Sequence, residues 1–118
     1  MKHSSLVVLY ISLMSVSCVS TNKKLVDDEL LQFAKANCFY AYFKKKNYDL
    51  KDIRAISGGI VEMGTYSAEK YQAVEELIKK YKPKYSTKHS VDNDLLKCFK
   101  LESDSDFIES LDRIKKDK

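Results

Sequence analysis

Apolar residues recur at helical spacing through most of the chain beyond its first 26 residues. Asp27 or Asp28 can cap a first helix that runs through Phe43 and carries Leu30, Ala34, Cys38, Ala41 and Tyr42 on one face. Another side of the same helix is also apolar and carries Ala36, Phe39 and Phe43. A helix that is apolar on two sides lies in a core or contacts a partner, and we favour the core.

A second helix is predicted to begin at Asp49, with a broad apolar stripe made of Leu50, Ile53, Ile56, Ile60 and Met63. The stripe also contains the small residues Ser57 and Gly64, which let another backbone approach closely. Gly59 lies on the opposite side from Leu50, where glycine costs about 1 kcal/mol relative to alanine. The run Ser57-Gly58-Gly59 therefore marks a kink, a break or a close subunit contact, and the sequence leaves these three open.

Three further helices follow. Ser67 caps the most regular one, whose stripe consists of Tyr71, Val74, Leu77, Ile78 and Tyr81, and Lys82-Pro83 ends it. Asp92 caps a short helix through Phe99. Ser103 or Asp104 starts the last helix, whose inward residues are Phe107, Ile108, Leu111 and Ile114. The pattern predicts an all-α fold, a compact bundle of about five helices.

The N-terminus has the pattern of an export signal. A basic residue, Lys2, precedes about nine apolar-rich residues, and small residues of the kind found at cleavage sites follow them. This pattern predicts a signal peptide over residues 1–17, with cleavage as late as residue 20. The apolar run is shorter than the roughly 20 residues of a membrane-spanning helix. Cys18 follows small residues, which makes it a candidate for lipidation. We expect a flexible segment over residues 18–26, a domain over residues 27–118, and a membrane contact only through a lipid on Cys18.

The cysteine count supports an exported domain with one disulfide. Lipidation of Cys18, or cleavage after Ser20, leaves Cys38 and Cys98 as a single pair. In an oxidising compartment two such cysteines are more often bridged than reactive. Closing a loop of this size stabilises a fold by roughly 4 kcal/mol in the chain-entropy model.

Composition and charge narrow the class of protein. The chain is 44% hydrophobic and 32% charged with three glycines and one proline, which indicates one folded domain rather than disorder or a many-stranded sandwich. A net charge of +4 is weak for a nucleic-acid binder, and export also argues against that partner. The densest basic run, Lys44-Lys45-Lys46, lies at the C-terminal end of a predicted helix, where positive charges interact favourably with the helix dipole.

No chemistry is expected from the exported part. A nucleophilic cysteine would need a histidine base, and the only histidine beyond the signal is His89, while a disulfide consumes both Cys38 and Cys98. One histidine and two distant cysteines have no metal-ligand spacing. The sequence thus predicts neither catalytic residues nor a metal or cofactor, and an enzyme using Cys38 or Cys98 is the weakest alternative.

With no catalytic or metal site expected, the remaining candidate for function is a surface that binds a partner. Tyr66, Tyr81 and Tyr85 lie at or near predicted turns beside lysines, as interface anchors do, although each one alone more often covers its own helix. The segment from Lys84 to His89 differs, because it is too polar for a core and long enough to protrude.

At this point the chain resembles the type VI secretion amidase immunity proteins, small exported helical proteins of Gram-negative bacteria. The resemblance spans about residues 29–114. It rests on Cys38 in an aromatic-rich helix, on the small residues leading to Glu62-Met63-Gly64, and on the helix from Ser67 to Tyr81. It also rests on the polar loop after Pro83 and on Leu96-Lys97-Cys98. Such proteins tend to have a tyrosine shortly after the second cysteine, where this chain has Phe99-Lys100-Leu101-Glu102-Ser103.

The resemblance implies a periplasmic protein, commonly a homodimer, that binds a cysteine-dependent peptidoglycan amidase and blocks its substrate cleft. Our hypothesis for the effector-binding residues is Lys84, Tyr85, Ser86, Thr87, Lys88 and His89. Our candidates for a dimer contact are Ala36, Phe39, Phe43 and Gly59. A structural or adaptor lipoprotein of the cell envelope is the alternative from a different class.

Overall fold

A computed structural model describes residues 28–84 and 89–118. The predicted signal peptide, Cys18 and the segment 18–26 lie outside the described residues. So do four of the six predicted effector-binding residues, namely Tyr85, Ser86, Thr87 and Lys88.

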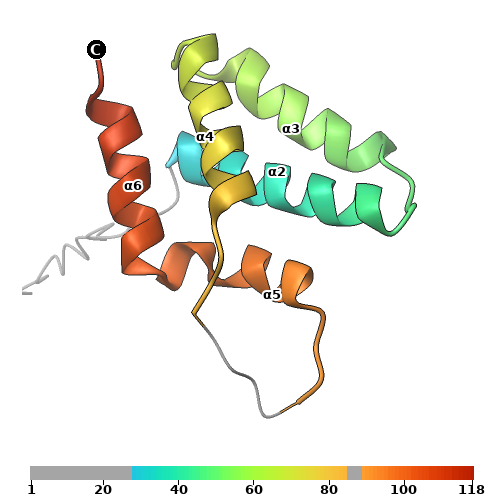
Figure 1. Cartoon of the computed structure of the whole chain (residues 1–118). Helices are drawn as coiled ribbons and strands as arrows, with labels where there is room; N and C mark the ends of the chain where they lie inside the picture. Colours follow the sequence, from blue (N-terminus) through green and yellow to red (C-terminus); the bar gives the residue numbers. More distant parts are fainter. Residues whose placement is uncertain (1–27, 85–88) are drawn as a thin grey trace, which may run out of the picture.

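The described residues form five α-helices and one 3₁₀ turn, with no strand among them (Figure 1). Their order is α2 (Glu29–Lys45), α3 (Lys51–Met63), α4 (Ala68–Lys80), α5 (Asn93–Lys100), η1 (Leu101–Ser103) and α6 (Ser105–Lys116). Helix α3 runs alongside α2, α4 crosses it, and α5 and α6 complete the bundle from the other side (Figure 1). The predicted all-α class with a disulfide is confirmed.

Three aspartates start helices as the sequence predicted. The carboxylate of Asp28 accepts a hydrogen bond from the Leu31 amide at 3.1 Å, and that of Asp92 accepts from the Asp94 amide at 2.9 Å. The carboxylate of Asp104 likewise accepts from the Asp106 amide at 3.0 Å. These bonds satisfy amides that lack a partner within the first turn, so each helix begins where its cap stands.

Helix α2 is the central helix, as favoured from its two apolar sides. It contacts α3, α4, α5 and α6, and it contributes six buried side chains to the interior, namely Leu30, Leu31, Phe33, Ala34, Ala36 and Cys38. Opposite them lie Tyr71, Val74, Ile78, Leu101, Phe107 and Leu111. Ala41, which the periodicity placed on the inner face, is exposed.

Helix α3 packs against α2, but most of the apolar stripe of α3 is not buried in this contact. The helix begins at Lys51, two residues later than expected, and it is continuous through Ser57 and Gly59. Of the three alternatives left open for this run, a break therefore does not occur. Of the stripe only Ile53 is buried, while Ile56 is 57% exposed and Met63 is 88% exposed. Among the described elements, α3 packs mainly against α2 and lies at one side of the bundle (Figure 1), and much of its apolar stripe stays exposed.

The carboxylate of Glu29 joins the start of α2 to the turn between α3 and α4. It accepts hydrogen bonds from the amide of Thr65 at 2.9 Å, from the Thr65 hydroxyl at 3.2 Å and from the Tyr71 hydroxyl. Burial alone would raise the pKa of Glu29, but these hydrogen bonds hold it below its ordinary value. Burial, together with the bond to Glu29, raises the pKa of Tyr71 to about 12.

Gly64 is the point at which this turn comes closest to its neighbours. A Cβ at position 64 would lie 1.9 Å from the Tyr71 hydroxyl, 2.3 Å from a Glu29 carboxylate oxygen and 2.7 Å from the Ile60 carbonyl oxygen. The close approach expected for this small residue is therefore made within the chain.

Candidate functional site

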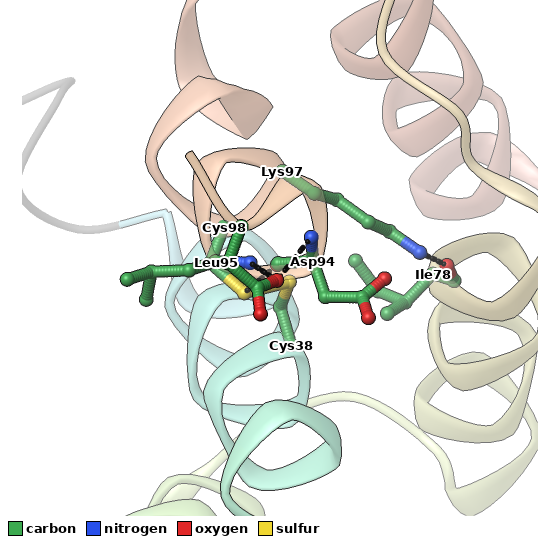
Figure 2. The surroundings of a disulfide bond; sticks show 7 residues. Cys38, Ile78, Asp94, Leu95, Lys97 and Cys98 are labelled. Atoms are coloured by element: carbon green, nitrogen blue, oxygen red, sulfur yellow. Dashed lines mark hydrogen bonds between the residues drawn. A yellow bond between two sulfur atoms is a disulfide. The ribbon is translucent and has the colours of Figure 1, made fainter. Parts of the chain in front are cut away.

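The disulfide lies under the point where α2 meets α5. Cys38 and Cys98 are bonded, with their Cα atoms 5.5 Å apart and 60 positions apart in the chain. Figure 2 shows the disulfide joining α2 and α5. Cys38 and Cys98 are only 3% and 1% exposed. The predicted pairing is confirmed, and neither sulfur is a free thiol.

Beside the disulfide, Lys97 connects α5 to α4. Its side chain extends from α5 toward α4, and its ammonium donates a hydrogen bond to the carbonyl of Ile78 in the last turns of α4 (Figure 2). Removal from water lowers the pKa of Lys97. The ammonium also lies 6.0 Å from the centre of the Tyr81 ring. Lys97 thus holds α5 against the end of α4, from which the segment 84–89 departs.

The residues that precede this segment are anchored in the core. The Tyr81 hydroxyl donates a hydrogen bond to Asp104, and its ring packs edge-on against Phe107 with 5.1 Å between the ring centres. This hydrogen bond, ahead of other causes, lowers the pKa of Asp104. Tyr81 therefore covers its own fold and is not an exposed anchor. Tyr66 is likewise packed against the core.

The residues that follow the segment are anchored by ion pairs to the end of α2. Lys46 lies 2.8 Å from the Asp92 carboxylate, and Lys45 pairs with Asp94. The hydrogen bond between Lys46 and Asp92 raises the pKa of the lysine and lowers that of the carboxyl. Helical periodicity could not reveal these pairs, because the partners belong to different helices and are more than 40 positions apart.

The structure thus brings the two ends of the segment onto one disulfide-bonded framework. Lys84 and His89, the two predicted effector-binding residues that are described, are both exposed. Lys84 lies 4.0 Å from the carboxylate of Asp106 on α6, and both of these side chains are largely in solvent. Such a pair contributes little to stability and leaves Lys84 available to a partner.

Three of the four candidate dimer-contact residues pack against other parts of this chain. Ala36 is only 5% exposed, so its side chain is covered by the chain's own core. The ring of Phe39 packs edge-on against Phe99 at 5.5 Å, and the ring of Phe43 packs against Tyr48 at 5.7 Å. Gly59 is the exception, because nothing lies within 4 Å of the place where its Cβ would be.

The described residues contain no group of three or more His, Cys, Asp or Glu side chains placed to hold a metal ion. None of the helices in the described ranges is long and apolar enough to cross a membrane.

Comparison with protein families then decides the class of this protein. Residues 29–111 match the Tai4 family, the type VI secretion system (T6SS) amidase immunity proteins. The chain belongs to this family. No curated protein and no solved structure matches the chain significantly. In this immunity protein the matched range begins with α2, contains both bonded cysteines and the segment from Lys84 to His89, and ends within α6.

Proposed function

We propose that this immunity protein binds its cognate peptidoglycan amidase in the periplasm and occludes the amidase active site. The observation that carries the proposal is the family match, which covers the whole described framework up to α6. The exported domain offers a rigid scaffold and a polar segment, and inhibition by occlusion needs no chemistry of its own. A protein of this kind is an inhibitor and not an enzyme.

The periplasmic location is supported by the bonded cysteines. Disulfides form and persist in oxidising compartments such as the bacterial periplasm. The export signal predicted over residues 1–17 leads to the same compartment, either as a free domain or tethered by a lipid on Cys18.

We assign the occluding role to the segment from Lys84 to His89. Its flanking residues, Tyr81 and Asp92, are held on the framework by a hydrogen bond and an ion pair, which limits the ordering that binding would require. In this proposal Tyr85 is the apolar anchor, and Lys84, Lys88 and His89 provide polar and charge complementarity. Tyrosine is among the residues that most often dominate an interface.

Replacing Tyr85 by Ala together with Lys88 by Glu should weaken amidase binding by about 100-fold, because an anchor and a charge contact are lost together. The melting temperature should stay nearly unchanged. Isothermal titration with a catalytically inactive cognate amidase measures the affinity. The matched control is Tyr48→Ala with Lys51→Glu, which changes an exposed tyrosine in the connection from α2 to α3 and the exposed first residue of α3. Equal affinity of the loop variant and this control would contradict the assigned role.

For the homodimer we propose that Gly59 lies at the contact, together with the exposed apolar residues of α3. A shallow hollow of about 570 Å³ beside Gly59 is lined by Ala55, Ile56, Ile60 and Met63, among others. Both Ile56 and Met63 are open to solvent in the single chain, and apolar side chains of this kind are favourable to bury between subunits.

Sedimentation velocity of the exported domain should therefore give a dimer, and Gly59→Glu should convert it to a monomer, because a buried carboxylate without a partner is costly. Gly58→Glu is the matched control, since Gly58 also has open space around it and lies one residue away on the helix. A strict monomer for the unchanged domain removes the dimer proposal and leaves the immunity role in place.

A further inference from the structure

A groove crosses the surface between the C-terminal halves of α2 and α4 and the first turns of α5. It consists of two hollows of about 360 and 460 Å³ that share Lys79 and Lys97. A smaller hollow of about 160 Å³ lies between them and reaches down to Cys38 and Ile78. Cys38 of the disulfide and Ile78, the last buried residue of α4, therefore form part of its floor. We call this feature the lysine groove.

The lysine groove is the place where positive charge gathers. Five lysines line its two larger hollows, namely Lys44, Lys45, Lys79, Lys82 and Lys97, against the two carboxylates of Glu75 and Asp94. This excess of three positive charges compares with a net charge of +4 for the complete chain. Asp94 is already paired with Lys45, and Lys79 pairs with Glu76 in an exposed contact. The positive potential over such a groove attracts an anionic partner.

Apolar surface alternates with these lysines. Tyr40, Ala41 and Ile78 line one hollow, and Tyr81, Pro83 and Leu96 line the other. A phosphate polymer or a lipid headgroup would use the charges and leave most of this apolar surface without a partner. A protein segment that carries both acidic and apolar side chains uses both, which is the usual make-up of a protein interface.

Residues on both sides of the segment assigned to the amidase line the lysine groove. Lys82 and Pro83 line one hollow and lead directly to Lys84, while Asn93 and Asp94 of the same hollow stand at the start of α5. A partner that contacts the segment from Lys84 to His89 thus comes within reach of the groove.

We propose that the lysine groove receives an acidic, partly apolar segment of the amidase itself, so that the effector is held at the groove as well as at the segment 84–89. This inference rests on the proposed function and names the second part of the same interface. Complementary charges across an interface raise the association rate in particular, and this contribution declines as salt is added.

The test is a triple charge reversal, Lys44→Glu, Lys79→Glu and Lys82→Glu, in the otherwise unchanged exported domain. All three side chains are exposed, and among the residues that the structure describes the ion pair that they lose is the surface pair of Lys79 with Glu76. The matched control reverses three exposed lysines elsewhere, Lys51→Glu, Lys116→Glu and Lys118→Glu. Both variants therefore carry the same net charge.

Binding is measured by stopped flow and titration against the inactive cognate amidase at low and at physiological salt. We expect the groove variant to lose about 100-fold in affinity at low salt, chiefly through a slower association rate, and to lose the salt dependence. The control should stay within about threefold of the unchanged domain, and both variants should keep its helical content and melting temperature.

The outcomes separate this inference from the proposed function. If the unchanged domain does not bind the amidase, the proposed function fails. If the unchanged domain binds and the groove variant binds as the control does, the lysine groove has no part in recognition and the inference is overturned. The inference is also overturned if the groove variant keeps its amidase affinity but no longer binds anionic phosphatidylglycerol vesicles, because the groove would then be a membrane surface.

Discussion

Replacing both Cys38 and Cys98 by alanine should lower the free energy of unfolding by about 4 kcal/mol. The bond closes a loop of 60 positions, and opening it restores conformational freedom to the unfolded chain. In the folded chain it is the covalent link between α2 and α5, and the segment 84–89 lies between α4 and α5 (Figure 1). A total stability of about 5–15 kcal/mol is normal for a domain of this size, so the loss is a large share.

Urea unfolding of the oxidised domain, the reduced domain and the double variant measures this effect. Reduction of the unchanged domain should reproduce most of the loss, because it opens the same loop without changing other residues. If the oxidised and reduced domains unfold at the same urea concentration, the disulfide does not stabilise the fold. The amidase affinity of whatever fraction remains folded then shows whether the bond also positions the interface.

Replacing Gly64 by alanine should destabilise the fold by about 2 kcal/mol, because the added methyl group meets three oxygen atoms at once. Two of these belong to the Glu29 and Tyr71 side chains, whose hydrogen bond would have to open. The third is the Ile60 carbonyl oxygen, a backbone atom that moves only if the end of α3 moves.

Gly58→Ala is the matched control, and its expected effect has the opposite sign. Gly58 lies inside α3 with nothing within 4 Å of its added Cβ, so alanine should stabilise the helix by about 0.5–1 kcal/mol. Thermal and urea unfolding of both variants measures the difference. Equal stability of the two variants would show that the contact between Gly64 and Glu29 carries no energy.

The parts of the fold that depend on neighbouring residues followed from the sequence. Asp28, Asp92 and Asp104 bond to amides two or three positions ahead, so their effect is visible in a short window. The regular stripe of α4 likewise placed Tyr71, Val74 and Ile78 in the core. The pairing of Cys38 with Cys98 was predicted from the cysteine count together with the expected removal or lipidation of Cys18, and the structure confirms the pair.

Burial of individual side chains did not follow from periodicity alone. Ile56 and Met63 lie on the apolar stripe of α3, but none of the helices in the described ranges covers them, so they remain exposed. Ala36, proposed for a subunit contact, is instead covered by the chain. Periodicity identifies which residues share a face of a helix, and only the packing of the other helices shows which part of that face is covered.

The sequence by itself thus predicted the helical class, the cap at Asp92, the bonded cysteines and a resemblance that the family match confirms, and it narrowed the other two caps to neighbouring pairs of residues. The tertiary structure alone decided how α5 is held to α2 and α4, where Gly64 is crowded, and that five lysines from separate elements line one groove. The physical reason is range. Caps and periodicity depend on residues within one helix, and the cysteine number is read directly from the composition. Ion pairs, close contacts and surface potential depend on residues that are distant in the sequence and that only the folded chain brings together.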